Sequence, residues 1–168
     1  VRVYQRDTSA NIGWTQLGED IDGVTQTFNY FGSSVSLSSD GLIVAIGAYG
    51  NSDNSSFHGH VRVYQRDTNV ALGWTKLGGD IDGEATSDYS GISVSLSSDG
   101  SIVAIGAPYN DDNGNASGHV RVYQYDSNKG TANTNQDSDT FGPVGWNRLI
   151  QDIDGEASGD YSGTSVSL

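Results

Sequence analysis

An internal repeat constrains the fold of this chain more than any other feature. The segment Val-Arg-Val-Tyr-Gln begins at Val1, Val61 and Val120, at intervals of 60 and 59 residues. Three more segments recur in the same order, Gly-Trp, Asp-Ile-Asp-Gly and Ser-Val-Ser-Leu, and they begin at residues 13, 73 and 145, at 20, 80 and 152, and at 34, 93 and 165. Such a period indicates one supersecondary unit that is stacked along the chain.

Each unit carries the signals of four short strands, and no segment has a helical period of useful length. In the best-preserved unit these segments alternate apolar and polar residues or form short apolar runs, at 93–96, 102–106, 120–124 and 146–150. The pair Asp99-Gly100 separates the first two and predicts a tight hairpin. Four antiparallel strands in about sixty residues fit a propeller blade better than a solenoid coil. The sequence therefore predicts an all-β fold of β-propeller-type blades in about three repeats.

The strand order divides the chain unevenly. Residues 1–31 form the end of one blade, 32–90 a full blade, 91–162 a second full blade, and 163–168 the first strand of the next. The second full blade carries a polar insertion at 125–144, which we expect to be a surface loop. Propellers usually need at least four blades to close, so an open arc would expose the apolar faces of its end blades. We therefore expect either neighbouring copies or covalently continuous repeats to cover these faces, and the chain to be part or a processed product of something longer.

The net charge of the chain disfavours some classes of binding partner. It holds 21 acidic and 8 basic residues, for a net charge of −13. This charge disfavours nucleic acid and anionic membrane surfaces as partners. The chain has no cysteine, which excludes disulfides and thiolate metal sites. No apolar stretch approaches the roughly 20 residues of a membrane helix, so we expect no membrane insertion.

Short motifs resemble the FG-GAP repeat of integrin-α-type β-propellers. Residues 105–108, Ile-Gly-Ala-Pro, follow an Asp-Gly turn and an apolar strand, and residues 30–35 carry the matching Phe-Gly element. In the other two units serine replaces the phenylalanine and the glycine remains. Gly-His-Val-Arg-Val-Tyr, at 59–64 and 118–123, resembles the third-strand element of that repeat. The resemblance implies an extracellular adhesion or surface-repeat protein, with a propeller of about seven blades.

Acidic turns are the main candidates for a metal site. Carboxylates at alternate positions before a glycine suit Ca²⁺, and they recur as Asp80, Asp82, Glu84 and Asp88, and as Asp152, Asp154, Glu156 and Asp160. The first unit has Val24 and Phe28 where the later acids fall. The same residues are ordinary turn chemistry that needs no ion. The polar loop 110–115 is a second calcium candidate, but its counterpart 51–54 has one carboxylate. The resembled family binds calcium in a longer loop between the first two strands. The corresponding loops 38–41 and 97–100 are too short, so the metal residues of that family do not carry over.

Three other kinds of side chain recur at fixed positions: histidines 58, 60 and 119, tryptophans 14, 74 and 146, and arginines 2, 62 and 121. The histidines suit either a transition metal or a structural hydrogen bond, and we favour the second. The tryptophans suit sugar stacking or packing between blades, and strict recurrence favours packing. The arginines are expected to pair with acids of the same or the adjacent blade.

No catalytic residues are predicted. The chain lacks a Gly-x-Ser-x-Gly elbow and a phosphate-binding loop, and its acids lie in repeated turns. An asymmetric pocket built by residues 125–144 stays open as an alternative. Asn54 and Asn115 begin Asn-x-Ser sequons and are candidate glycosylation sites.

The leading hypothesis is a non-catalytic extracellular repeat module with a structural or adhesive role, which assembles through blade-to-blade contacts. The alternative is a ligand-binding propeller that recognises glycans or proteins through its rim loops, with calcium as a candidate ion. Loops that differ between units, such as 49–59 and 109–118, favour the alternative.

Overall fold

The structure is a computed structural model that describes residues 1–6, 13–25, 28–52, 56–67, 73–132 and 141–168. These residues form strands, turns and loops without a helix, and none of them belongs to a helix able to cross a membrane. The strands are β1 (Tyr4–Arg6), β2 (Trp14–Gln16), β3 (Ser34–Leu37), β4 (Ile43–Ala48), β5 (His60–Arg66), β6 (Trp74–Lys76), β7 (Ile81–Asp82), β8 (Ser93–Leu96), β9 (Ile102–Ala107), β10 (His119–Tyr125), β11 (Trp146–Arg148) and β12 (Ile153–Asp154).

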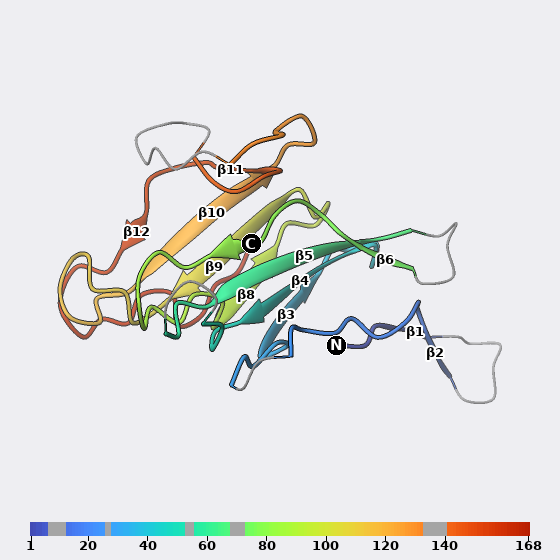
Figure 1. Cartoon of the computed structure of the whole chain (residues 1–168), viewed down its shortest axis with the longest axis horizontal. Coiled ribbons are helices and arrows are strands. Elements are labelled where there is room, and N and C mark those ends of the chain that lie inside the picture. The colour runs from blue at the N-terminus through green and yellow to red at the C-terminus, as the bar shows by residue number, and fades with distance from the viewer. Residues whose placement is uncertain (7–12, 26–27, 53–55, 68–72, 133–140) are drawn as a thin grey trace.

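The strands form three antiparallel sheets that follow one another in chain order (Figure 1). The first sheet is the pair β1–β2. The central sheet has the order β3-β4-β5-β6, with β7 on the start of β5. The last sheet has the order β8-β9-β10-β11, with β12 on the start of β10. The four-stranded meanders confirm the predicted all-β, blade-like architecture, and each sheet is called a blade below.

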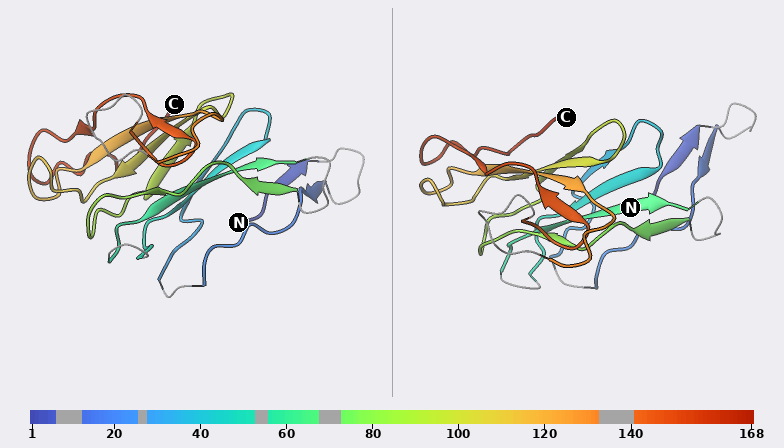
Figure 2. Two further views of the ribbon diagram at one scale, coloured as in Figure 1. Left: turned by 45° about the horizontal axis from the view of Figure 1, so that its top comes forward. Right: turned by 90° about the horizontal axis from the view of Figure 1, so that it is seen from above.

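The apolar strands are buried on both faces because a blade packs against each face of the central sheet (Figure 2). Ala45 pairs with Val63, and both side chains face the last blade. Their neighbours Val44 and Tyr64 form the next pair and face the first blade. Successive side chains along the strand therefore point into the two cores in turn. This arrangement explains the continuous apolar run of β4.

The Asp-Ile-Asp-Gly segments differ from the expectation that they are acidic turns. In β7 the central residue Ile81 pairs with Val61 and is buried in the core between the central and last blades. In β12 the equivalent Ile153 pairs with Val120. The predicted boundaries also shift by one or two residues, since β10 begins at His119 and β11 ends at Arg148. Only two residues of each segment join the ladder, too few for a recognisable alternation.

The blades approach each other closely at the Ile-Gly-Ala segments. A side chain at Gly47 would overlap the carbonyl oxygen of Gly91, and one at Gly106 would overlap that of Gly163. The hydroxyl of Ser34 donates a 2.7 Å hydrogen bond to the same Gly91 carbonyl. Glycine therefore recurs at this position because backbone of the next unit occupies the space of a side chain.

Candidate functional site

Each tryptophan after the first connects its blade to the preceding blade. The indole nitrogen of Trp74 donates a 2.7 Å hydrogen bond to the carbonyl of Leu17. Trp146 repeats the contact with the carbonyl of Leu77, at 3.1 Å. Trp146 is fully buried, whereas Trp14, which has no preceding blade in this chain, is 60% exposed. The tryptophans therefore act as inter-blade contacts, as their recurrence predicted.

Two identical Ser-Val-Ser-Leu strands have opposite environments. In β8, Val94 and Leu96 are 9% and 5% exposed, because they pack against the central blade. In β3, Val35 and Leu37 are 54% and 48% exposed. The difference arises because the first blade holds only β1 and β2 among the described residues, and neither covers β3. The face of β3 is therefore an apolar contact surface without its partner strand.

The last blade shows the same effect on its opposite face. Ile81 is buried beneath the last blade, and its equivalent Ile153 is exposed. Val61 and Val63 are completely buried, whereas their equivalents Val120 and Val122 are only partly buried. We call the exposed face of β3 the incoming face and this face of the last blade the outgoing face. Both expose residues that an adjacent blade buries elsewhere in the same chain.

The recurrent arginines pair with the first acid of the Asp-Ile-Asp segment, within their own blade. The distances between nitrogen and oxygen are 2.9 Å for Arg2–Asp20, 2.7 Å for Arg62–Asp80 and 2.6 Å for Arg121–Asp152. This confirms the pairing expected of these arginines. The exposure of the arginine falls from the first blade to the last, because each later arginine faces the blade before it.

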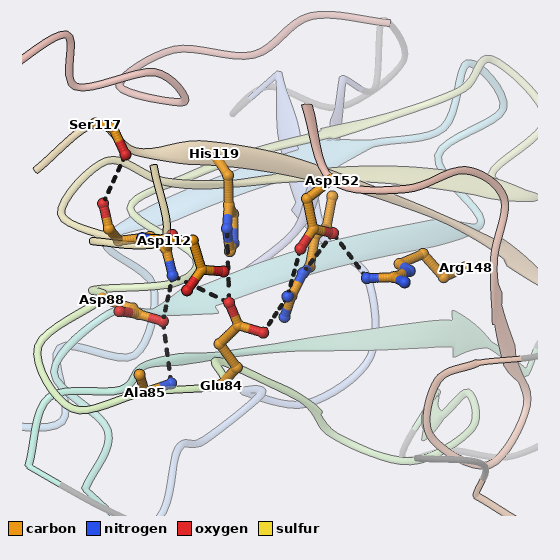
Figure 3. A network of polar contacts seen from close by, with 10 residues as sticks. Glu84, Ala85, Asp88, Asp112, Ser117, His119, Arg148 and Asp152 are labelled. Carbon is orange, nitrogen blue, oxygen red and sulfur yellow. Dashed lines mark hydrogen bonds and ion pairs between the residues drawn. The ribbon is translucent and has the colours of Figure 1, made fainter. Parts of the chain in front are cut away.

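A polar cluster lies at the seam between the central and last blades (Figure 3). Glu84, from the segment after β7, makes a close ion pair with Arg121 of β10. Arg121 also donates two hydrogen bonds to Asp152, at 2.8 and 2.6 Å. Asp112, from the loop between β9 and β10, hydrogen-bonds to Glu84. His119 of β10 points at the same carboxylate, with 3.9 Å between its Nδ1 and Oε1 of Glu84.

Two further side chains hold this cluster in place. Arg148 of β11 donates a 2.8 Å hydrogen bond to Oδ1 of Asp152. The buried amide of Asn110 donates to Oε1 of Glu84 at 3.0 Å and to Oδ2 of Asp88 at 3.2 Å. Asn110 and Arg121 of the last blade therefore both bind acids of the preceding segment. The seam is closed by hydrogen bonds as well as by apolar packing.

Charge is unevenly balanced within the cluster. Burial raises the pKa of Glu84 and of Asp152, but hydrogen bonds from Arg121 outweigh it and leave both pKa values below normal. The hydrogen bond to Glu84, together with burial and repulsion from the same carboxylate, raises the pKa of Asp112 to about 6. Burial and the nearby charge of Arg121 lower the pKa of His119, which favours neutral imidazole. Asp112 is thus the carboxyl group without a cation of its own.

The cluster is a possible metal-binding group, and it overlaps the predicted calcium residues only in part. Ligand atoms of Glu84, Asp112, His119 and Asp152 all lie within 4.8 Å of one another, and no other such group of three or more occurs among the described residues. Of the eight predicted ligands, the group contains Glu84 and Asp152. Asp112 belongs to the loop 110–115, the second calcium candidate, and His119 was expected to have a structural role. One difference between the repeats could have indicated this site: Glu84 occupies the position that is equivalent to Val24 in the preceding repeat.

The other six predicted ligands have separate roles. Asp80 binds Arg62 and Lys76, and Asp82 lies 4.0 Å from His58. Asp88 and Asp160 each accept a hydrogen bond from a backbone amide three residues earlier, as in an ordinary turn. Asp154 and Glu156 are exposed. The six to eight oxygens that Ca²⁺ prefers are therefore not collected in either turn, and calcium binding there stays a prediction.

An asymmetric pocket of about 280 Å³ adjoins the cluster. Asp82, Glu84 and Arg121 line the pocket together with Phe141 and Pro143 of the insertion. The guanidinium of Arg148 lies 4.5 Å from the centre of the Phe141 ring and supports it. The pocket breaks the repeat symmetry because only this unit carries the insertion. An asymmetric pocket built by residues 125–144 was one of the alternatives that the sequence left open.

A row of aromatic rings crosses both seams. Five tyrosines follow one another with ring centres 4.9 to 5.9 Å apart, Tyr30, Tyr49, Tyr89, Tyr109 and Tyr161. Of the candidate glycosylation sites, Asn115 is exposed in the loop before β10, and Asn54 lies outside the described residues.

Comparison with known proteins agrees with this geometry. The FG-GAP repeat matches at residues 14–64 and again at 81–123, which together cover more than half of the chain. A search of curated proteins finds no match. The first matched segment runs from β2 to β5 and the second from β7 to β10, and each contains one Ser-Val-Ser-Leu strand and one of the close glycines, Gly47 and Gly106. The chain therefore belongs to the FG-GAP repeat family and is a propeller-type repeat module.

Proposed function

We propose that this chain is a non-catalytic structural or adhesive module that acts outside the cell and works by blade-to-blade contact. Its two end faces bind further blades of the same repeat, either in a continuous chain or in a second copy. The extracellular setting is typical of the FG-GAP family. A localisation experiment would test it, since exposure of the native protein to protease added to intact cells distinguishes surface from internal protein.

One observation carries the proposal, the opposite burial of identical strands. Val94 and Leu96 are covered by the blade before them, and Val35 and Leu37 present the same side chains uncovered. Burying a leucine or valine side chain contributes about 1.5–3 kcal/mol, so an uncovered pair favours association with a matching surface. The outgoing face supplies that surface, since it exposes Leu149 and Ile153, the equivalents of residues 77 and 81 that contact the following blade.

Solution molar mass tests the contact. We expect the chain to associate as its concentration rises, and the substitution Leu37→Ser to weaken association about tenfold or more. Leu42→Ser is the matched control, because Leu42 is also exposed and the equivalent position in the next repeat is already serine, Ser101. Light scattering across a concentration series measures both variants. A monomer at every concentration, or equal effects of the two substitutions, would contradict self-association through this face.

The pocket supports a second candidate function, the binding of a hydroxyl-rich ligand such as a glycan. Carboxylates of Asp82 and Glu84 can accept hydrogen bonds from hydroxyl groups, and Phe141 adds an aromatic ring to the lining of the same pocket. Titration with a panel of oligosaccharides, for the native chain and for Phe141→Ala, tests this candidate. Loss of binding in the variant supports it, and an absence of binding by the native chain excludes it for that panel. Repeating the titration with a chelator would show whether calcium takes part.

A further inference from the structure

A buried histidine at the central seam points into a group of carboxylates without a hydrogen bond on one nitrogen. The side chain of His119 is 3% exposed, and its Nδ1 has no hydrogen-bond partner. A buried nitrogen without a partner costs free energy, and native proteins rarely leave one unless it has another ligand. The nearest acidic atom is Oε1 of Glu84 at 3.9 Å, too far for a hydrogen bond.

The carboxylates around Nδ1 come from two different blades. Glu84 follows the central blade, and Asp112 belongs to the loop that precedes β10. Their ligand oxygens and a ring nitrogen of His119 lie within 4.8 Å of one another. Ligand atoms about 2.1 Å from a tetrahedral Zn²⁺ are separated by roughly 3.4 Å. Side-chain movements of about an ångström would therefore bring the three atoms into coordination distance, and the exposed Asp112 leaves a path for an ion to enter.

Electrostatic balance favours a cation at this point. Asp152 is neutralised by Arg121 and Arg148, and Glu84 shares Arg121. Asp112 has no such partner and faces the carboxylate of Glu84. A divalent ion between them would take the place of the hydrogen bond that joins the two carboxyl groups, would contact both carboxylates and would use the free imidazole nitrogen.

We propose that Glu84, Asp112 and His119 bind one divalent transition-metal ion, of the class represented by Zn²⁺, across the seam between the central and last blades. One nitrogen and two carboxylate oxygens suit Zn²⁺ better than Ca²⁺, which prefers six or more oxygens. The ion would crosslink two repeats, and its function is local stability of this seam. The site is independent of the end-face contacts proposed above.

The neighbouring repeats show why the site belongs to this seam. In the preceding repeat Val24 takes the place of Glu84, so the corresponding seam lacks one ligand. In the following position Glu156 is exposed on the outgoing face. The two positions equivalent to Glu84 therefore each lack one requirement of the site: Val24 lacks the carboxylate, and Glu156 lacks a facing blade among the described residues.

Zinc titration of the tag-free chain tests the proposal. Calorimetry and equilibrium dialysis should give one equivalent of bound Zn²⁺, and saturation should raise the unfolding temperature, since the ion binds the folded state. Asp112→Asn should weaken binding about tenfold or more and abolish the temperature shift. This variant keeps the shape of an exposed side chain and removes no ion pair with arginine, so it should fold normally. His119→Gln, checked for folding by circular dichroism, should have the same effect.

Glu156→Gln is the matched control, because it removes the equivalent acid where no blade faces it. It should bind zinc as the native chain does. Substitution of Co²⁺ should give visible absorption that is lost in Asp112→Asn, which separates this site from binding at His58 and His60. The proposal is overturned if the native chain binds less than stoichiometric zinc, if Asp112→Asn binds zinc unchanged, or if Ca²⁺ binds at this site more tightly than Zn²⁺.

Discussion

Replacement of Trp146 by alanine should destabilise the chain far more than the same change at Trp14. Both residues follow a glycine with positive φ and begin the fourth strand of a blade. Trp146 is fully buried against the preceding blade and donates a 3.1 Å hydrogen bond to the carbonyl of Leu77. Trp14 is 60% exposed. The pair therefore isolates the contribution of the seam from that of the local sequence.

The size of the difference follows from burial. Removing a buried tryptophan side chain costs about 3–5 kcal/mol, and the Leu77 carbonyl also loses its donor. A surface substitution usually changes stability by less than about 0.5 kcal/mol. In a domain of 150–250 residues, 1 kcal/mol corresponds to about 2–4 °C in melting temperature, so Trp146→Ala should lower it by roughly 6–20 °C. Trp14→Ala should change it by about 2 °C or less.

Calorimetry and urea unfolding followed by circular dichroism measure the difference. Both should be carried out at low protein concentration, so that association through the incoming face does not bury Trp14 in a second copy. Trp146→Phe provides a milder variant, which keeps most of the apolar contact and removes the indole hydrogen bond. If Trp14→Ala and Trp146→Ala destabilise the chain equally, the burial of the seam tryptophan has been misjudged and the face-to-face packing is wrong.

Two more perturbations test the blade contacts and the ion pairs. Gly47→Ala should destabilise the chain by several kcal/mol or prevent folding, because the added methyl group would overlap the Gly91 carbonyl. Gly130→Ala is the control, because a methyl group added there meets open space. Equal melting temperatures of the two variants would refute the close approach of the blades at Gly47. Partial burial raises the pKa of Asp80, but hydrogen bonds from Arg62 and Lys76 outweigh it and lower the pKa to about 2. Because its pKa is lower in the folded chain than in the unfolded chain, ionised Asp80 stabilises the fold at pH values above 3.8, the unfolded pKa. This contribution to the free energy of unfolding is on the order of 1 kcal/mol after solvent screening, and it is lost as the pH falls toward 2. Urea unfolding between pH 6 and pH 2.5 should show a shallower loss of stability in Asp80→Asn, and an unchanged pH profile would argue against the ion pair.

Much of the fold could be predicted from the residues because its determinants are local. The turn at Asp99-Gly100 forms as expected, with Gly100 at a φ of 72° and its amide bonded to the Ser97 carbonyl. Two-residue alternation identified β8 and β10 because successive side chains of a strand point to opposite faces of its sheet. The recurrence of tryptophan predicted a packing role, and the recurrence of arginine predicted an ion pair. A side chain that is present in every unit is expected to make a contact that is also repeated in every unit.

The candidate site was predicted only in part, because its members come from different blades. Glu84 was predicted as a calcium ligand together with Asp80 and Asp82, its neighbours in the chain. The structure instead places Glu84 against Asp112 and His119, which lie 28 and 35 residues further along. Alternate residues share a face only along a continuous strand, and β7 contains only Ile81 and Asp82, so Glu84 lies beyond the strand and binds a different partner from Asp80.

By itself the sequence determined the repeat, the longer strands of the blades and the residues able to pack between blades. Which of those residues are buried was decided by the tertiary structure alone. The segment Ser-Val-Ser-Leu is buried in β8 and exposed in β3 with no difference in its own residues. Burial depends on the surface of the neighbouring blade, and no local pattern in a strand records whether that neighbour is present.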